Sequence, residues 1–517
     1  MKVKNLALGM FAISLMASCS NNDLVDENLS TGNLSGNSYV AVKVVTPSMS
    51  NESRALGGFS DGTVDENSVT SVQFLFFDKD GNSCGIAPQT INSFSWTKQT
   101  AGSSQNIEAY SDAVILFSNP TSVPAKILAI LNPTGNEGFS ASTTLADVQA
   151  KSADYRSYQT NGNFVMSNSV YKNANGDIMY TTPLELKNIA KTQDDAKNNP
   201  VTIPVERVLA KVGVTDGSLN VTSAAQVLKV DGVDLSITAS LVGFKVTYDN
   251  NVSYLLKNMT GYENYGGWNW NDVNNMRSYW ATSAVGTYEN YNYNEVSANK
   301  NPVYCNENTS STTPKLIVAA QLKATSGGAA VTLMKWRGVM YSEQGLRNHF
   351  ANILGKYYKK TSAAGVTPAT YASIAPTDFA FTTQGSRPYN VTVSLVSGAP
   401  TFYTLSTDGS GTKIATDATT ALNADINSLG DILYWKDGMT YYYVDIEHNG
   451  GEGLGAKGLV RNHVYQISIA SVTGLGTPIW QPSNDIIPET PTNESSYIAA
   501  KINVLGWKIV SQSVDLK

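Results

Sequence analysis

Residues 39–45 read Tyr-Val-Ala-Val-Lys-Val-Val, and this stretch alternates as a half-buried β-strand does. Side chains two residues apart point to the same face of a strand, so Val40, Val42 and Val44 share one face. Pro47 ends the run, because proline cannot donate a hydrogen bond to a neighbouring strand. The sequence therefore predicts a strand here with one apolar face.

Strand-like segments of this kind recur along most of the chain. The 27 Tyr and 41 Gly residues favour strands and turns over helices, so the predicted fold class is mainly all-β. The segments predicted as strands are 69–77, 126–131, 201–214 (a strand or a strand–helix junction), 236–248, 316–322, 331–336, 432–445, 464–472 and 497–516. Two short helices are predicted, in 145–154 and 341–359. We expect 316–322 to pair with 331–336, and 432–445 to form a hairpin around Asp437-Gly438.

The composition sets limits on size, charge and redox chemistry. At 517 residues, 42% of them hydrophobic and 15% charged, the chain is long enough for two or three globular domains. A net charge of −6 does not favour nucleic acid as a partner. No apolar segment after residue 19 is long enough to span a bilayer as a helix. Cys84 and Cys305 could form a disulfide, but a single pair is not the disulfide framework that holds a small secreted domain together. We favour the interpretation that both are buried free thiols.

The N-terminus carries an export signal. Lysines precede the apolar run Leu6–Met16, which is too short to cross a membrane but suits a secretory signal. Residues 15–19 read Leu-Met-Ala-Ser-Cys and resemble a bacterial lipobox, which implies that Cys19 is acylated and becomes the first residue after cleavage. The protein is then exported and tethered to a membrane by lipid; the alternative is an ordinary signal peptide. Residues 20–38 are polar and are predicted to form a disordered tether.

No catalytic or metal-binding motif keeps the structural context that its chemistry needs. Residues 58–62 match G-x-S-x-G, but they follow a loop and precede no helix. Residues 453–458 match G-x-G-x-x-G, but a predicted strand follows instead of the helix that binds a pyrophosphate. Residues 78–82 begin like a calcium loop, yet Gln89 stands where the closing glutamate belongs. The 3 histidines lack the spacing of a zinc helix. We therefore predict no enzyme, no cofactor and no metal.

The region 262–304 is dense in Tyr, Trp and Asn, and it admits two interpretations. Flat aromatic rings beside Asn side chains can stack on sugars, with Trp268 and Trp270 as the candidate glycan contacts. The same rings can instead pack long loops against a sheet, which is the interpretation that we favour. A non-polymerising surface lipoprotein that binds glycans therefore stands as the alternative function.

Several segments, in order along the chain, resemble one protein family. Residues 458–478 begin Gly-Leu-Val-Arg-Asn-His-Val-Tyr and resemble the RNH-x-Y segment of fimbrillins. These are the type V pilins of Gram-negative anaerobes, here in particular the minor-fimbrium shaft type. Residues 304–309 are similar to their Y-C-x-E-N-T segment, and residues 506–516 look like their C-terminal W…Q-x-VDL signature. With the patterns at 72–81 and 164–167, the resemblance covers nearly the whole chain.

The resemblance implies a fold and a domain arrangement. We expect two transthyretin-like β-sandwich domains with a few short helices, at 55–215 and 216–517. A lipoprotein signal peptide at 1–19 and a removable propeptide at 20–54 precede them. The family also implies an arginine-specific protease that cuts at the outer surface and removes the strand at 39–45.

The implied mechanism is a strand exchange that builds a fibre. By position, the cut maps to Arg54-Ala55, in a loop of small residues of the kind that proteases attack. The strand that carries Val40, Val42 and Val44 then leaves the first domain, and C-terminal strands of another copy replace it. The predicted donor residues, within about 497–516, are Ile498, Ile502, Val504, Trp507, Val510, Val514 and Leu516. The alternative is a terminal hairpin that folds into its own domain.

The resulting prediction is a structural subunit of a surface fimbria, a pilus shaft that supports adhesion. Expected partners are other copies of the chain, accessory tip and anchor subunits, the arginine-specific protease, and host or bacterial surface receptors. The precursor is expected as an outer-membrane lipoprotein, held to the membrane by its lipid. The mature form is expected in the extracellular fimbrium.

Overall fold

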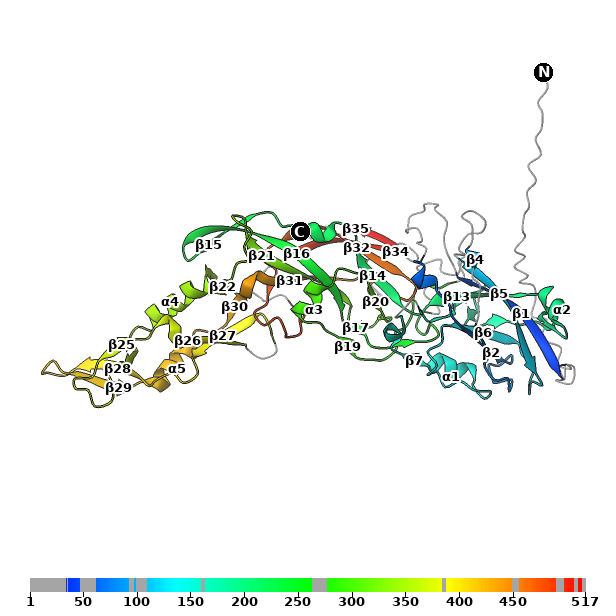
Figure 1. Cartoon of the computed structure of the whole chain (residues 1–517), viewed down its shortest axis with the longest axis horizontal. Helices are drawn as coiled ribbons and strands as arrows, with labels where there is room; N and C mark the ends of the chain where they lie inside the picture. The colour runs from blue at the N-terminus through cyan, green and yellow to red at the C-terminus, as the bar shows by residue number, and fades with distance from the viewer. Residues whose placement is uncertain are drawn as a thin grey trace, which may run out of the picture.

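The computed structural model shows an elongated molecule built mainly of β-strands, as Figure 1 displays. It describes residues 34, 36–46, 62–92, 97–98, 109–159, 163–262, 277–383, 387–448, 455–489, 497–505 and 510–513. The sheets of the first part of the chain lie at one end (right in Figure 1), those of the second part lie in the middle, and a smaller lobe forms the other end. The predicted fold class, all-β sandwiches with a few short helices, is confirmed.

The first part of the chain folds into a sandwich-like arrangement of strands. Their order is β3-β2-β6-β8-β13-β1-β5-β4, with β11 beside β6 and β12 beside β1. The strands are β1 (Asn37–Thr46), β2 (Val72–Phe77), β3 (Gln89–Ile91), β4 (Thr97–Lys98), β5 (Ala109–Ser118), β6 (Lys126–Leu131), β8 (Met166–Asn168), β11 (Thr182–Pro183), β12 (Ile189–Ala190) and β13 (Val201–Arg207). Helices α1 (Leu145–Ala150) and α2 (Gln193–Lys197) cover parts of it. Its core is formed by aliphatic and aromatic side chains such as Phe74, Ile127 and Ile203.

Strand β13 belongs to both layers of this sandwich. Its first half, Val201–Pro204, pairs with β1, whereas its second half, Val205–Arg207, pairs with β8. The change of partner sends the end of β13 toward the second part of the chain, so that Glu206 and Arg207 lie at the boundary between the two parts.

The second part forms another sandwich from two sheets. The smaller sheet has the order β20-β14-β32-β34-β35, with β14 (Ala210–Val214), β20 (Val303–Cys305), β32 (Val464–Thr473), β34 (Tyr497–Leu505) and β35 (Val510–Ser513). The larger has the order β26-β27-β30-β22-β23-β15-β16-β21-β31-β33. Its strands are β15 (Gln226–Val230), β16 (Val233–Thr247), β21 (Lys315–Ala324), β22 (Leu333–Trp336), β23 (Val339–Tyr341), β26 (Phe379–Thr383), β27 (Asn390–Leu395), β30 (Ile432–Trp435), β31 (Met439–Asp445) and β33 (Thr477–Pro478). Helix α3 (Tyr293–Ala298) packs against β16 and β21.

A lobe inserted between β23 and β30 has a hydrophobic core of its own. It consists of α4 (Glu343–Ile353), α5 (Thr419–Asn427), β26, β27 and a sheet of order β25-β24-β28-β29. That sheet is formed by β24 (Tyr358–Lys360), β25 (Tyr371–Ser373), β28 (Phe402–Thr407) and β29 (Lys413–Asp417). Leu346, Phe350, Phe402 and Leu422 are buried in this third core.

Three short strand pairs complete the described sheets. They are β7 (Ser152–Ala153) with β18 (Ser253–Tyr254), β9 (Tyr171–Lys172) with β10 (Ile178–Met179), and β17 (Asp249–Asn250) with β19 (Tyr288–Glu289). Two of these pairs join regions that are far apart in the chain, whereas β9 and β10 form a local hairpin. The pair of β7 and β18 connects the first part of the chain to the second. The 3-10 helices are η2 (Asp65–Asn67), η3 (Tyr155–Tyr158), η5 (Leu186–Asn188), η6 (Ser218–Asn220), η7 (Pro376–Asp378) and η8 (Lys436–Gly438).

Two predicted strand pairings are wrong. Strand β21 pairs with β16 and β31, whereas β22 pairs with β23 and β30, so 316–322 and 331–336 do not form the predicted strand pair. They touch only where the chain turns between them, with the Val331 backbone donating to the Leu322 carbonyl oxygen at 3.1 Å. Likewise β30 pairs with β22 and β27 rather than with β31. The turn at Asp437-Gly438 exists, but it carries the chain between two separate places in the sheet. A Cβ at Gly438 would lie 2.3 Å from the Leu322 carbonyl oxygen, so this close approach needs glycine.

Ala210 is the first residue along the chain that belongs to the second core, although later residues such as Leu255 and Trp280 pack back into the first core. Strand β14, which precedes the expected boundary at 215/216, pairs with β20 and β32 of the second sandwich, and the predicted domain bounds stay a prediction. Cys84 and Cys305 are both free and buried, as we favoured. In the described part of the chain, no helix combines the length and the apolar character that crossing a membrane requires.

Candidate functional site

Strand β1 lies in the interior of a sheet although it comes from the N-terminal end of the described chain. All ten residues of β1 pair antiparallel with β5 along one edge. On the other edge, Tyr39 and Val40 pair with β12, and Val42–Val45 pair parallel with β13. The strand is therefore hydrogen-bonded along both edges. We call the position between β5 on one side and β12 and β13 on the other the β1 slot.

The inner face of β1 completes the first core. Val40, Val42 and Val44 are 0%, 1% and 0% exposed and belong to the same core as the aromatic residues of β2. This confirms the face that the alternation predicts. Burying one such aliphatic side chain is worth about 1.5–3 kcal/mol, so the three together contribute about 5–9 kcal/mol.

The outer face of β1 is covered as well. Ala41, which points away from the core valines, is only 4% exposed, and α2 packs against β1, β5 and β12. Lys43 Nζ lies 4.0 Å from the centre of the Tyr110 ring on β5. We call residues 186–199, which comprise η5, β12 and α2, the strap, because α2 reaches across β1 to contact β5 as well as β12. Figure 1 shows α2 beside β1.

The chain is anchored again soon after β1. The predicted cleavage pair, Arg54 and Ala55, lies outside the described residues, in the stretch between Thr46 and Gly62. Beyond it, Glu66 in η2 is 1% exposed and accepts hydrogen bonds of 2.5 Å from both Lys211 and Tyr304. Burial disfavours the charged carboxylate, but these two hydrogen bonds, the charge of Lys211 and a backbone hydrogen bond from Thr63 together lower the pKa of Glu66. The segment after the predicted cut is thus held independently of β1.

The predicted donor segment forms a hairpin within its own chain. Strand β34 pairs antiparallel with β32, and β35 pairs with β34, so that β35 is the last described strand of its sheet. Ile498, Ile502 and Val504 lie on β34 and Val510 on β35. This is the arrangement of the alternative interpretation, a terminal hairpin in its own domain. Donation of the hairpin to another copy stays a prediction.

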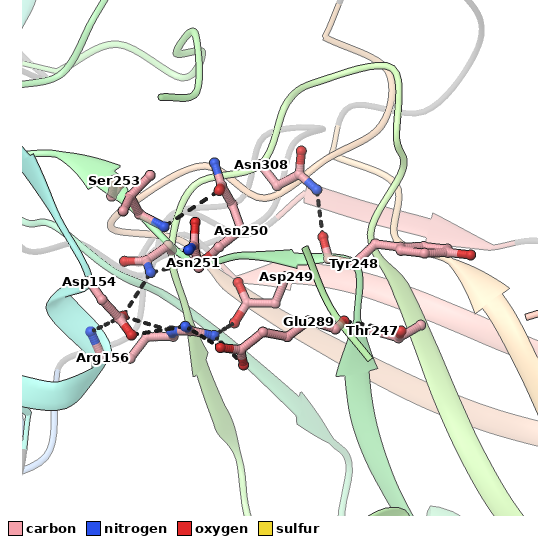
Figure 2. A network of polar contacts seen from close by, with 12 residues as sticks. Asp154, Arg156, Thr247, Tyr248, Asp249, Asn250, Asn251, Ser253, Glu289 and Asn308 are labelled. Carbon is pink, nitrogen blue, oxygen red and sulfur yellow. Dashed lines mark hydrogen bonds and ion pairs between the residues drawn. The ribbon is translucent and has the colours of Figure 1, made fainter. Parts of the chain in front are cut away.

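The two sandwiches meet at a polar junction, shown in Figure 2. Arg156 in η3 of the first part donates to Asp249 at 2.7 Å and to Glu289 at 2.9 Å in the second part. It also binds Asp154 at 2.8 Å, and Asp154 accepts from Asn306 at 2.9 Å. Burial raises the pKa of Asp249 to about 7, with Arg156 opposing the rise. One guanidinium therefore joins three carboxylates from both sides of the junction.

Two fully buried ion pairs lie deeper in the same junction. Lys257 Nζ lies 2.9 Å from Glu206 Oε1 on β13, and it also donates to the Ser278 carbonyl oxygen at 3.0 Å. Arg461 lies 2.6 Å from Glu307. All four charged side chains are fully buried. Burial raises the pKa of Glu206 and lowers that of Lys257, while their mutual attraction opposes both shifts.

Arg461 and its neighbours connect the slot to the predicted donor hairpin. The Arg461 guanidinium donates to the carbonyl oxygens of Leu255 at 2.9 Å and of Tyr254 at 2.5 Å. The side chain of Asn462, whose φ of +56° is left-handed, accepts from the Arg207 backbone at 3.4 Å. Residue 464 then begins β32, which pairs with β34. The RNH segment therefore joins the end of β13 to the sheet that holds the hairpin.

Two histidines are buried beside these charges. His448 Nε2 lies 2.5 Å from the Tyr279 carbonyl oxygen, which can only accept, so Nε2 carries the proton. His448 Nδ1 then accepts from the Tyr465 hydroxyl at 2.8 Å. His463 Nδ1 donates to the Arg461 carbonyl oxygen at 2.7 Å. Hydrogen bonds therefore fix the orientation of both buried rings in the junction.

Burial and nearby positive charge keep His463 neutral. Burial, His448 and the cations Lys257 and Arg277 together hold the pKa of His463 well below its usual value. The third histidine, His349, packs between Trp336 and Tyr341, each with a ring-centre distance of 5.4 Å. Among the described residues, no group of three or more His, Cys, Asp or Glu side chains could hold a metal ion.

The other predicted site residues fall outside what the structure describes. They are Cys19, Arg54, Ala55, Trp268, Trp270, Trp507, Val514 and Leu516. The two tryptophans offered as glycan contacts therefore stay a prediction. Tyr262, Tyr279 and Trp280 of the same aromatic region are buried against the first core, as the packing interpretation expects.

The motifs set aside in the sequence have structural explanations. Asp78 accepts backbone hydrogen bonds from Asp80 and Asn82 at 2.9 Å, which is a tight turn. In the G-x-G-x-x-G segment, a Cβ at Gly455 would lie 2.1 Å from Trp280, and one at Gly458 would lie 2.6 Å from the Asn308 carbonyl oxygen. These glycines allow close packing at the junction rather than binding of a nucleotide.

Sequence reasoning missed the charged residues of the junction. Glu206, Lys257, Arg156 and Asp249 stand far apart in the chain and form no local pattern. The sequence carried only an indirect indication of the junction, namely that Glu307 and the RNH segment lie within the stretches that resemble fimbrillins. Those stretches are the ones that the fold brings together at the junction.

Comparisons with known proteins agree with this resemblance. A family model described as major fimbrial subunit protein (FimA) matches residues 38–207. A second, described as major fimbrial subunit protein type IV, fimbrillin, C-terminal, matches residues 433–513. Among solved structures, a fimbrial assembly protein from Parabacteroides distasonis is 15% identical, with 56% of this chain and 84% of that chain covered and a TM-score of 0.29. A search of curated proteins finds no match.

The two matched stretches contain the two elements of the site. The first begins just after Asn37, where β1 starts, and ends with β13. The second contains β31, β32, β34 and β35. The lobe between β23 and β30 lies outside both.

Proposed function

The chain is a fimbrillin-family protein, a structural subunit of a surface fimbria, and from that premise we propose that it polymerises by exchanging β1 for a strand of another copy. The observation that carries the proposal is the place of β1. It is an interior strand, hydrogen-bonded along both edges and buried by Val40, Val42 and Val44, yet all the strands beside it come later in the chain, so the covalent connection after Thr46 is the one that joins it to them.

The covalent connection explains why the uncut chain stays closed. A tethered strand competes at high effective concentration, so no strand from outside displaces it. Cleavage at Arg54-Ala55 removes this advantage, while Glu66 keeps the new N-terminal segment in place. Loss of β1 would leave the edges of β5 and β13 unpaired and part of the core open.

The C-terminal hairpin supplies a replacement of suitable chemistry. In sequence, residues 498–504 alternate aliphatic and polar side chains much as β1 does. The slot and the hairpin lie on different parts of one chain, so contacts between copies are head-to-tail and need not close. Repeated contacts of this kind make a filament, which is the shaft of the fimbria.

The proposal includes the route to the cell surface. Cys19 would carry the lipid that holds the precursor at the outer membrane, and an arginine-specific protease would cut after Arg54. Tip and anchor subunits and surface receptors are further partners in this proposal.

A protease experiment tests the exchange. The full chain and its Arg54→Ala variant are treated with an arginine-specific protease, and the products are examined by denaturant-resistant multimer ladders and electron microscopy. We expect ladders and fibres from the natural chain and single subunits from the variant. The control is Arg387→Ala, which removes an exposed arginine elsewhere in the chain and should leave the fibres unchanged.

A second variant tests the donor. Deletion of Ser496 to Lys517 should leave the chain cleavable but unable to extend a fibre. Ladders from the Arg54→Ala variant would show that cleavage is not the trigger, and fibres from the deletion variant would exclude the hairpin as donor.

A further inference from the structure

The strap, residues 186–199, encloses the first half of β1 together with the core. Ile189 and Ala190 pair with Val40 and Tyr39, after which α2 crosses the outer face of β1, and the chain returns as Val201 beside Val42. Both pairings lie on the same edge of β1. One continuous segment of chain, from β12 through α2 to β13, therefore pairs with this edge of β1 at two places. Between the two places its helix α2 covers the outer face of β1.

A strand enclosed in this way cannot leave sideways. Strand β5 blocks one edge along all ten residues, and the core closes the inner face. Withdrawal along the axis would drag Val40 and Val42 through core positions and break the hydrogen bonds of both edges together. Removal of β1, or insertion of another strand, therefore requires one wall of the slot to open first.

The strap is the least firmly held wall. Of the strap residues 186–199, all of which the structure describes, Asn188 and Ala196 are buried, Ile189 and Ala190 are half-buried, and the others are exposed, so Ala196 and the half-buried pair are its apolar contacts. By contrast, β13 is fixed at its far end by the buried pair of Glu206 and Lys257. Segments with few buried apolar contacts open at the lowest free-energy cost.

Hydrogen bonds at its start, at its base and within its helix would let the strap move as one rigid segment. The backbone of Leu184 donates to the Ala125 carbonyl oxygen at 2.8 Å and fixes the start of the segment. The Asn188 side chain donates to the Asn199 carbonyl oxygen at 3.0 Å and closes its base. Thr192 caps α2 by accepting from the Asp195 backbone at 3.1 Å.

We propose that the strap is a gate that must open before β1 leaves the slot and before a replacement strand enters, so that it sets the rate of exchange in both directions. This inference rests on the proposed function and adds its regulation. A gate changes the rates of binding and release together, whereas a simple binding surface changes release alone. The two possibilities are therefore separable by kinetics.

The test uses the full chain, cut with an arginine-specific protease at low concentration. A fluorescent synthetic peptide of residues 37–46 is added in excess, and its binding and release rates are followed by anisotropy. Ala196→Arg places a charged side chain at the buried position of α2, the helix that packs against β1, and should therefore open the strap. We expect both rates to rise about tenfold with little change in the dissociation constant.

Two further variants make the result specific. Gln193→Arg adds the same charge at an exposed position of α2 and should change neither rate. Asn188→Ala removes the hydrogen bond at the base of the strap and should raise both rates by about threefold, in a chain whose core is intact. Melting temperatures of the uncut proteins confirm that each variant folds.

The outcomes separate the gate from the exchange itself. If Ala196→Arg and Asn188→Ala raise the release rate alone, or change neither rate, while the natural chain exchanges its strand, the strap is not a gate. If β1 stays bound in every cut variant and no peptide enters, the gate and the proposed exchange both fail. Faster binding and release in both variants supports the gate.

Discussion

The β1 slot and the junction between the sandwiches are both buried, but they are held by opposite kinds of interaction. The slot holds β1 with three valines and backbone hydrogen bonds, neither of which depends on a particular side-chain charge. The junction holds its two sides with buried ion pairs such as Glu206–Lys257 and Arg461–Glu307. Apolar contacts are non-directional, whereas a buried charge requires its partner at a fixed distance.

This difference suits two different tasks. Another strand with alternating aliphatic residues could fill the slot with similar energy, so the slot is suited to exchange. A buried charge whose partner alone is removed costs about 3–5 kcal/mol, so the junction is suited to a permanent connection within one subunit. A fibre needs both kinds of joint, because subunits must be exchangeable during assembly and stiff afterwards.

The largest effect is expected at the junction. Lys257→Met leaves Glu206 buried without its cation and should lower the free energy of unfolding by about 3–5 kcal/mol. The measurement is the urea unfolding curve of the full chain, with Lys229→Met, which removes an exposed ion pair, as a control expected within about 0.5 kcal/mol. The double variant Lys257→Met with Glu206→Leu should recover most of the loss. A single variant as stable as the natural chain would show that the charges are not what holds the junction.

An intermediate effect is expected in the slot. Val42→Ala deletes two buried methyl groups and should cost about 2 kcal/mol in the stability of the uncut chain. Lys43→Ala on the outward face, where Lys43 contacts Tyr110, should cost about 0.5–1 kcal/mol. Thermal unfolding measured on both variants checks this order. The reverse order would mean that the strap face rather than the core face retains β1.

The smallest effect on stability at neutral pH is expected from the titration of His463 in the junction. Because the folded chain lowers the pKa of His463, the unfolded chain takes up a proton first as the pH falls below about 6.5. The contribution of His463 to the free energy of unfolding is therefore fully present above about pH 6.5. Below that pH it falls by up to about 1.4 kcal/mol per pH unit. Melting temperatures at pH 7.5 and 5 should therefore fall less in His463→Gln than in the natural chain. An equal fall in both would assign the acid sensitivity to other groups.

Local periodicity predicted the strands well. The alternation of residues 39–45 predicted β1 and its buried face, and the run at 126–131 coincides with β6. These predictions succeed because the side chains that decide them lie within a few residues of one another. The pairing of 432–445 failed because the turn at Asp437-Gly438 does not reveal which strands lie next to each half.

The sequence by itself determined where the chain extends, which faces are apolar, and that no motif has the context of an active site. Only the tertiary structure decided that β1 is an interior strand under a strap, and that Glu206, Lys257, Glu307 and Arg461 meet. The physical reason is the range of the interactions. Backbone geometry sets side-chain alternation locally, whereas strand neighbours and charge partners are chosen by burial across distant parts of the chain.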